Sequence, residues 1–348
     1  MSLDRLRRQI DALDDQILQL LNQRARLAKH IGAQKSTAYA PGREKQVLSR
    51  LARAAADPLT PNAVAHIYTE IISACRAIEE PLTIAYLGPT HTFSHRAAIE
   101  KFGSSAEFLP VPSVHEIFTA VAKGNADFGM VPIENSLQGV EAPTLDALAA
   151  SDLCICGELY LDVHHCLLST VAREAVTQVF SHPQALAQCR TWLRTHVPRA
   201  ECVETSSTTA GAEQALRTPN AAAIAPKAAA ALGLSVLAEN VEDVAGNRTR
   251  FFTIGRLECP PTGSDKTSLL FATQHRPGAL FEALRPFRDK SINLTMIEAR
   301  PARHTAWEYL FFLDFLGHQH DDAVAQALEQ LRRVCTFVKV LGSYPEAQ

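Results

Sequence analysis

Residues 3–32 read LDRLRRQIDALDDQILQLLNQRARLAKHIG and decide the fold at the start of the chain. Apolar residues recur there in steps of three and four, the spacing of the buried stripe of a long helix. They are Leu3, Leu6, Ile10, Leu13, Ile17, Leu20, Leu27 and Ile31. Arg24 falls on the same stripe, where a guanidinium is costly to bury unless an anion meets it. The pattern predicts a helical bundle that holds an anionic ligand, although an arginine at a stripe edge also reaches solvent by snorkelling.

Further ionisable residues are predicted to face the same core. Lys35 lies only about 20° from Arg24 around the helix and about 16 Å along it. A second helix is expected to open at Arg43-Glu44, and a third over residues 64–79 turns Glu79 inward. Several charged groups aimed at one core favour a small dianionic ligand over a purely structural bundle.

The first eighty residues resemble an all-helical chorismate mutase. The resemblance implies a Claisen rearrangement of chorismate to prephenate, which needs a clamp on two carboxylates and a donor for the ether oxygen. The implied site residues are Arg7, Arg24, Lys35, Arg43, Glu44, Cys75 and Glu79. The three arginines hold carboxylates, Lys35 and Glu79 face the ether oxygen, and Glu44 takes the ring hydroxyl. Arg7 lies about 25 Å from Arg24 along one helix, so we expect a homodimer or higher homo-oligomer whose sites borrow Arg7 from another chain.

Composition limits the remaining classes of function. The chain has 348 residues, 47% of them hydrophobic, which suits two or three domains. Its 34 basic and 37 acidic residues leave a net charge of −3, so neither nucleic acid nor an anionic membrane is an expected partner. No run reaches the eighteen apolar residues of a membrane span, and the N-terminus lacks the pattern of a signal peptide. Eight cysteines without a C-x-x-C motif read as buried thiols, and we expect a cytoplasmic protein.

No metal or cofactor is expected. His91 and His95 have the i, i+4 spacing of zinc ligands, but the flanking glutamate of a metalloprotease is missing. Cys154, Cys156 and Cys166 lack tetrahedral partners at matching spacing, so packing in strands is favoured. Gly88-Pro89 is not a dinucleotide fingerprint, because the later glycines are absent.

After Pro81 the pattern changes to alternating strands and helices, which predicts an α/β fold. Small polar residues follow several strands, where such sheets bind ligands. The strand-like runs are 83–86, 108–111, 127–131, 163–168, 176–180, 221–224 and 251–255, and the polar segments are 88–94, 132–136, 181–184 and 206–209. The segment Asn247-Arg248-Thr249-Arg250-Phe251 places a hydroxyl between two arginines, suited to anion binding and proton delivery. A polar turn that opens a strand is the alternative.

Together these segments resemble prephenate dehydratase over residues 82–257. The resemblance implies a two-lobed fold similar to periplasmic solute-binding proteins, with Thr249 giving a proton or hydrogen bond to the departing ring hydroxyl as carbon dioxide leaves. Arg248 or Arg250 would hold a carboxylate. Thr92, Ser94, Asn135, Ser181, Ser207 and Thr208 would line the cleft. His91 stands where the family often has Gly, so the first loop is expected to differ in shape.

A third unit is expected at 265–345, after the linker at 260–263. Its strands at 266–273, 292–300, 307–316 and 337–341 and its helices at 278–288 and 321–334 give the βαββαβ order of a ferredoxin-like fold. Arg276-Pro277-Gly278-Ala279-Leu280 and Glu298-Ala299-Arg300-Pro301 resemble the phenylalanine-binding motifs of an ACT domain. Gly278, Ala279, Leu280, Glu298 and Arg300 are the implied ligand residues, and Ala299 replaces the usual Ser. The alternative is a helix start and a strand end without a ligand.

The three resemblances agree in their chemistry. They imply a bifunctional enzyme with domains at 1–80, 82–257 and 265–345, which makes prephenate from chorismate, converts it to phenylpyruvate and is inhibited by L-phenylalanine. A fused arogenate dehydratase is a close alternative. A non-catalytic amino-acid sensor is the alternative from another class, but it needs neither Thr249 between arginines nor the inward-facing Arg24.

Overall fold

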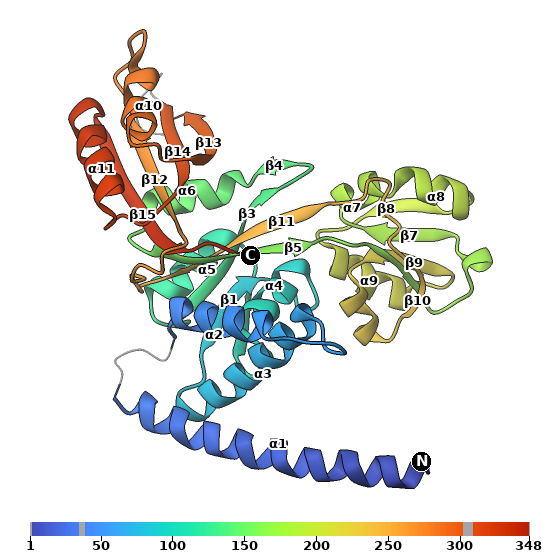
Figure 1. Ribbon diagram of the computed structural model, residues 1–348. Coiled ribbons are helices and arrows are strands. Elements are labelled where there is room, and N and C mark those ends of the chain that lie inside the picture. The colour runs from blue at the N-terminus through green and yellow to red at the C-terminus, as the bar shows by residue number, and fades with distance from the viewer. Residues whose placement is uncertain (1, 35–38, 302–308, 348) are drawn as a thin grey trace. The chain divides into compact units, whose positions relative to one another are not determined.

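The chain forms two compact units, which we describe separately: Met1–Thr83 with Ile99–Glu107, and Ile84–Ala98 with Phe108–Gln348 (Figure 1). A computed structural model describes residues 2–34, 39–301 and 309–347. Among the helices of these residues, none has both the length and the apolar character that crossing a bilayer requires.

The first unit contains the three expected helices, α1 (Leu3–Gly32), α2 (Pro41–Arg53) and α3 (Pro61–Glu79). The start of α3 follows from its sequence, because the Thr60 side chain accepts a hydrogen bond from the Ala63 amide at 3.2 Å and Pro61 occupies the first turn. Both α1 and α2 pack against α3. The all-helical first part is therefore confirmed.

The apolar stripe of α1 is not buried within one chain. Leu3 is 62% exposed and Leu20 64% exposed, and no described residue of α1 is buried. The expectation of a buried stripe is wrong for the single chain, because contact with α3 leaves most of that face in solvent. An exposed apolar face of this length needs a partner surface.

The second unit begins with a two-lobed α/β part. Its first sheet has the order β2-β1-β3-β11-β5, with β4 paired to β3. The strands are β1 (Thr83–Leu87), β2 (Glu107–Val111), β3 (Phe128–Asn135), β4 (Gly139–Val140), β5 (Cys154–Asp162) and β11 (Arg248–Gly255), and the helices of this lobe are α4 (Phe93–Phe102), α5 (Val114–Ala122) and α6 (Ala142–Ala150).

The second lobe has a sheet of its own, in the order β10-β6-β9-β7-β8. Its strands are β6 (Cys166–Ser169), β7 (Gln178–Ser181), β8 (Glu201–Glu204), β9 (Ala221–Ala225) and β10 (Ser235–Glu239). The helical elements are η1 (Arg173–Ala175), α7 (Pro183–Gln188), α8 (Arg190–His196), α9 (Thr208–Arg217) and η2 (Lys227–Leu232). The two-lobed α/β fold predicted from the sequence is confirmed.

The chain crosses between the lobes twice. It leaves the first lobe between β5 and β6 and returns between β10 and β11. The crossings lie side by side, because the Val163 amide donates to the Asn247 carbonyl at 2.8 Å. Residues on the crossings therefore face both lobes.

Two strands reach further than the sequence indicates. β3 continues to Asn135 and β11 already begins at Arg248, so the polar ends of both strands are paired. In this antiparallel register Thr249 lies opposite Asn135. The alternative of a polar turn before the strand is therefore wrong.

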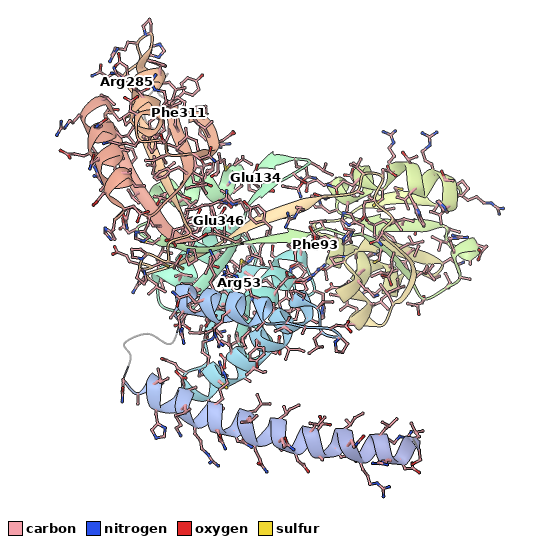
Figure 2. All side chains as sticks on the ribbon, viewed as in Figure 1. Arg53, Phe93, Glu134, Arg285, Phe311 and Glu346 are labelled. Atoms are coloured by element: carbon pink, nitrogen blue, oxygen red, sulfur yellow. The ribbon has the colours of Figure 1, made fainter. Side chains whose placement is uncertain are left out.

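The C-terminal part has the predicted ferredoxin-like fold. Its sheet order is β13-β14-β12-β15. The elements are β12 (Asp265–Ala272), α10 (Ala279–Asp289), β13 (Leu294–Pro301), β14 (Tyr309–Leu316), α11 (Asp322–Val334) and β15 (Phe337–Pro345). One face of the sheet packs on the two helices, and there Phe271 stacks on Phe311 with ring centroids 5.1 Å apart. Figure 2 marks Phe311 in this domain.

The other face of this sheet meets the first lobe through a buried charge cluster, which we define as Glu158, Arg250, Lys266 and Asp314. Arg250, which is 3% exposed, donates from Nε to Glu158 at 2.8 Å and from Nη1 to Asp314 at 2.5 Å. Lys266 lies 3.0 Å from Glu158. The lobe and the C-terminal sheet form one compact unit, so the boundary drawn between them stays a prediction.

The charge cluster predicts a large stability effect at Glu158. Burial alone raises the pKa of Glu158, but Arg250 and Lys266 hold it below its ordinary value. Glu158→Gln leaves Arg250 and Lys266 with Asp314 as the remaining acid of the cluster, so one buried positive charge is uncompensated and the free energy of unfolding should fall by about 3–5 kcal/mol. Because the pKa is depressed, the stabilisation from Glu158 is present above about pH 4.3 and is lost as the pH falls through the folded-state value.

Denaturant unfolding of Glu158→Gln and the parent protein measures this difference. Asp289→Asn removes an acid from an exposed pair with Arg288 and serves as the control, with an expected change in the free energy of unfolding that is within the scatter of the measurement. Equal stability of all three proteins would contradict the role of the cluster.

Candidate active sites

The first candidate site is a pocket of about 280 Å³ in the helical unit, here called the helical pocket. It is lined by apolar side chains and by five of the residues predicted to bind a dianionic ligand. The lining residues are Arg24, Leu27, Ala28, Ile31, Ala40, Arg43, Glu44, Val47, Ile72, Cys75, Arg76 and Glu79. Residues from all three helices therefore meet in one cavity.

The electrostatics of the helical pocket favour an anion. Nη1 of Arg24 is buried and has no hydrogen-bond partner among the described residues. A buried guanidinium nitrogen without an acceptor is costly. A carboxylate in the pocket would supply the missing acceptor.

Arg76 is a pocket residue that the sequence reading missed. Its Nη1 donates to Oε1 of Glu44 at 2.5 Å and its Nη2 to the Phe102 carbonyl at 2.6 Å, with the side chain almost fully buried. Arg76 follows Ile72 by four residues, so it lies on the same inward face of the helix, and this spacing could have identified it. Because Arg76 engages Glu44, it orients the carboxylate predicted to meet a ring hydroxyl.

Of the two remaining predicted residues, Arg7 does not line the helical pocket in one chain. Arg7 lies on the exposed part of α1, 3.8 Å from Asp4. Lys35 lies outside the described residues.

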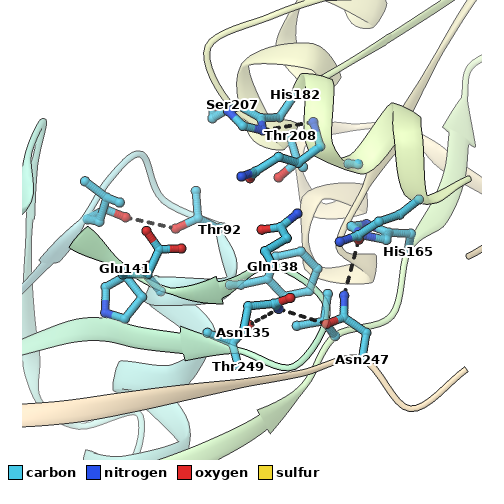
Figure 3. Close-up of a pocket in the computed structure, with 18 of the residues that line it drawn as sticks. Thr92, Asn135, Gln138, Glu141, His165, His182, Ser207, Thr208, Asn247 and Thr249 are labelled. Atoms are coloured by element: carbon cyan, nitrogen blue, oxygen red, sulfur yellow. Dashed lines mark hydrogen bonds between the residues drawn. The ribbon is translucent and has the colours of Figure 1, made fainter. Parts of the chain in front are cut away.

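The second candidate site is a cavity of about 380 Å³ between the two lobes, here called the interlobe cleft (Figure 3). Hydroxyl and amide side chains from both lobes and both crossings line it. Its residues are Leu87, Gly88, Thr92, Phe93, Ser94, Pro112, Pro132, Asn135, Gln138, Glu141, Val163, His165, His182, Gln184, Ala185, Gln188, Ser206, Ser207, Thr208, Asn247, Thr249 and Phe251.

The centre of the cleft is the pair formed by Asn135 and Thr249. Nδ2 of Asn135 donates to Oγ1 of Thr249 at 2.9 Å and to Oδ1 of Asn247 at 2.8 Å (Figure 3). The strand register that sets Thr249 opposite Asn135 makes this contact. The cleft therefore presents an oriented hydroxyl among neutral amides.

Comparison with known proteins decides the family. Residues 6–80 match the type II chorismate mutase family, residues 84–259 the prephenate dehydratase family and residues 267–333 the ACT domain family. A bifunctional chorismate mutase/prephenate dehydratase from Aquifex aeolicus is 43% identical over 99% of this chain and 98% of its own length. The chain belongs to the bifunctional chorismate mutase/prephenate dehydratase family. It is an enzyme with both activities and a C-terminal ACT domain.

Solved structures agree with this membership. A prephenate dehydratase from Arthrobacter aurescens, solved in complex with L-Phe, is 37% identical, with a TM-score of 0.71 over 76% of this chain and 90% of that chain. GqqA, a quorum quenching acylase, is 30% identical with a TM-score of 0.71 over 76% of this chain and 98% of that one. The dehydratase fold alone therefore does not fix the reaction, whereas the full-length relatives share the mutase domain as well.

The structure brings six of the nine predicted dehydratase residues to the interlobe cleft. They are Thr92, Ser94, Asn135, Ser207, Thr208 and Thr249. Thr92 donates to the carbonyls of its own loop, and Ser207 caps α9 by accepting from the Ala210 amide at 3.0 Å. These two hydroxyls shape the walls of the cleft as well as line it.

Ser181, Arg248 and Arg250 are not among the residues that line the interlobe cleft. Ser181 is buried and donates to the Ile224 carbonyl at 2.5 Å. Arg248 lies 2.9 Å from Asp162 at the surface. Arg250 belongs to the charge cluster, where both its carboxylate partners come from the protein.

The interlobe cleft is also lined by residues that were not predicted from the sequence. Gln138, Glu141, His165 and Gln188 line it. Burial raises the pKa of Glu141, which immediately precedes α6. Gln138 lies two residues beyond the predicted polar segment 132–136, which was a usable signal, whereas His165 and Gln188 meet the cleft through long-range contacts.

His91 adopts a backbone conformation that favours glycine. Its φ of 66° lies in the left-handed region, which glycine adopts without steric cost. The expected difference in loop shape from the family stays a prediction.

In the ACT domain, Gly278 has a φ of 79° and immediately precedes α10, and Ala279 is buried in its first turn. Leu280 packs at the margin of the domain core. Glu298 and Arg300 lie on β13, and Arg300 is 3.5 Å from Asp146 on α6. Nε of Arg300 is buried without a hydrogen-bond partner among the described residues.

Proposed function

We propose that Thr249 donates the hydrogen bond that assists departure of the ring hydroxyl of prephenate. The direction of its hydrogen bond to Asn135 supports this role. The Leu137 amide donates to Oδ1 of Asn135 at 3.0 Å, so Asn135 presents its amide nitrogen to Thr249 and Thr249 accepts. The hydroxyl hydrogen of Thr249 has no acceptor in the hydrogen bonds of the described residues, so it is free for the substrate.

The reaction needs little more than this from a side chain. The bond from the ring to the carboxylate breaks, its electron pair makes the ring aromatic, and the hydroxyl leaves and becomes water on gaining a proton. An alcohol is a weak acid, so Thr249 acts mainly by stabilising negative charge on the departing oxygen. Thr92, Ser94, Ser207 and Thr208 bind the rest of prephenate with neutral hydrogen bonds.

For the mutase, we propose that Arg24 and Arg43 hold the carboxylates of chorismate. Glu79 faces the ether oxygen, and Glu44, held by Arg76, meets the ring hydroxyl. The unpartnered Nη1 of Arg24 supports carboxylate binding most directly. Arg7 reaches this site from a second copy of the chain in a homodimer, and the exposed stripe of α1 supplies an apolar surface for that partner.

We also propose that the ACT domain binds L-phenylalanine through Gly278, Ala279, Leu280, Glu298 and Arg300 and thereby inhibits the dehydratase. The relative from Arthrobacter aurescens, which contains L-Phe, supports this ligand. The buried charge cluster supplies a firm connection from the ACT sheet to the strand that carries Thr249. A cytoplasmic location is proposed as well, supported by the free cysteines.

Thr249→Val tests the dehydratase assignment. It keeps the shape of the side chain and removes the hydroxyl, so the dehydratase kcat should fall by about 10²–10³. The mutase rate should stay within about twofold, because its site lies in the other unit. Phenylpyruvate formation from prephenate and loss of chorismate measure the two activities.

Thr253→Val is the matched control for Thr249→Val. Thr253 lies in the same strand, and its buried hydroxyl has no hydrogen-bond partner among the described residues. Its loss should leave both activities intact. A dehydratase that tolerates Thr249→Val as well as Thr253→Val would contradict the proposal.

Mixed dimers test the shared mutase site. Arg7→Ala and Arg24→Ala should each abolish most mutase activity, whereas subunit exchange between them restores one site in each heterodimer. Random pairing makes half of the dimers heterodimers, so about a quarter of the parent activity should return. If mixing restores nothing although exchange is verified by mass spectrometry, Arg7 does not act across chains.

Gly278→Ala tests the phenylalanine site. It places a side chain at a left-handed position, so it should weaken phenylalanine binding by about tenfold while basal activities remain. Gly124→Ala is the control, since Gly124 has a φ of 76° and, like Gly278, has no atom within 4 Å of the position that a side-chain carbon would occupy. Calorimetric titration of both variants with phenylalanine measures the difference, and equal affinities would refute the assignment.

A further inference from the structure

We propose that His165 is a positioning residue of the dehydratase: it donates a hydrogen bond to Gln188 and so turns the amide N–H₂ of Gln188 into the interlobe cleft. This inference rests on the proposed role of Thr249, because both residues belong to one hydrogen-bond chain. The chain runs His165, Gln188, Asn247, Asn135, Thr249. It joins the second lobe, both crossings and the first lobe.

A single backbone amide sets the direction of every bond in this chain. The Leu137 N–H can only donate, so Asn135 must receive it through Oδ1 and donate through Nδ2. Asn247 therefore accepts from Asn135 through Oδ1, which leaves its Nδ2 to donate to Oε1 of Gln188 at 3.2 Å. The oxygen of Gln188 is thereby fixed as an acceptor.

His165 completes the chain only in one tautomer. Its Nε2 lies 2.8 Å from the same Oε1 of Gln188, and an amide oxygen cannot donate, so Nε2 must carry the hydrogen. Nδ1 of His165 is buried without a partner among the described residues. A hydrogen on Nδ1 would be a buried donor without an acceptor. The surroundings of both ring nitrogens therefore favour the neutral tautomer that carries its hydrogen on Nε2.

The surroundings of His165 hold the ring in place and keep it neutral. The side chain is 2% exposed and packs edge-to-face on Phe93 with ring centroids 5.5 Å apart. Its backbone amide donates to Oε2 of Glu242 at 2.9 Å. Burial lowers the pKa of His165, against the opposing effects of Gln188 and Glu242.

The consequence concerns Gln188. Nδ2 of Asn247 and Nε2 of His165 both donate to Oε1 of Gln188. If the Gln188 amide were flipped, its nitrogen would lie against these two donor nitrogens. Its N–H₂ group, which has no acceptor in the hydrogen bonds of the described residues, is left to the cleft that Gln188 lines. Gln188 thus offers a carboxylate or carbonyl of prephenate an oriented donor, and His165 acts through it without touching the substrate.

Three variants of His165 separate positioning from packing. The amide nitrogen of Gln is separated from Cα by the same number of bonds as Nε2 of His. The amide nitrogen of Asn corresponds instead to Nδ1 of His, and Leu has no nitrogen in its side chain. His165→Gln should keep the dehydratase kcat within about threefold, whereas His165→Asn and His165→Leu should lower it at least about tenfold, the equivalent of one hydrogen bond. Mutase activity, measured on the same full-length samples, should be unchanged in all three.

Nitrogen-15 spectra of the histidine-labelled parent protein provide a second readout, which reports the tautomer directly and not the activity. One imidazole should show the neutral Nε2–H pattern at a pH below the ordinary pKa of histidine, and its signal should be missing in His165→Gln. An Nδ1–H pattern for that ring, full activity in His165→Leu, or equal loss in His165→Gln and His165→Asn would each overturn the inference.

Thr249→Val, assayed in parallel, keeps the two proposals distinguishable. If Thr249→Val is inactive and His165→Leu fully active, only the role of His165 fails. If Thr249→Val is fully active, the role of Thr249 fails, and the histidine variants then report on Gln188 alone.

Discussion

The ion pairs of Arg250 fix the position of β11 between the interlobe cleft and the sheet of the ACT domain. Successive side chains of a strand point to opposite faces, and in β11 Thr249 lines the interlobe cleft while Arg250 is paired with Glu158 and Asp314 in the interior. A shift of β11 by one residue would turn Arg250 to the opposite face of the sheet and separate it from the buried carboxylates of Glu158 and Asp314, at a cost of several kcal/mol. The register that sets Thr249 opposite Asn135 is therefore protected by charges that never meet the substrate.

The same cluster explains why the ACT domain and the dehydratase form one compact unit. Lys266 and Asp314 enter it from the ACT sheet, and a side-chain carbon at Gly342 would collide with the backbone of Ile155 on β5. Lys339 of the ACT domain also donates to the carbonyl groups at the end of α6, the helix that begins beside Glu141 in the cleft. The proposed sites for phenylalanine and prephenate thus lie on elements that share contacts, and any coupling between them must be reciprocal in free energy.

Local patterns in the sequence were sufficient for the elements but not for their partners. The period of α1, the βαββαβ order and the polar segments predicted the three folds and six residues of the cleft. They did not reveal that Arg250 faces inward, because its partners lie 92 and 64 residues away and are selected by strand register. His165 and Gln188 escaped for the same reason. The stripe on α1 showed which face is apolar, but periodicity does not say whether the covering surface belongs to the same chain.

The position of Arg7 constrains how a second chain can cover that stripe. For Arg7 of one chain to lie level with Arg24 of an antiparallel partner, the two-fold axis must cross α1 midway between them, near residues 15 and 16. Residue 3 of one chain is then level with residue 28 of the partner. The two helices therefore overlap over residues 3–28, which is all of α1 (Leu3–Gly32) except its last turn. At about 1.5 Å per residue this is an overlap of about 38 Å, which includes Leu3, Leu20 and Leu27. In the proposed dimer, one placement of the axis would cover Leu3, Leu20 and Leu27 and would also bring Arg7 to the partner's mutase site. Burial of the apolar stripe and completion of the site therefore require the same arrangement of the two chains.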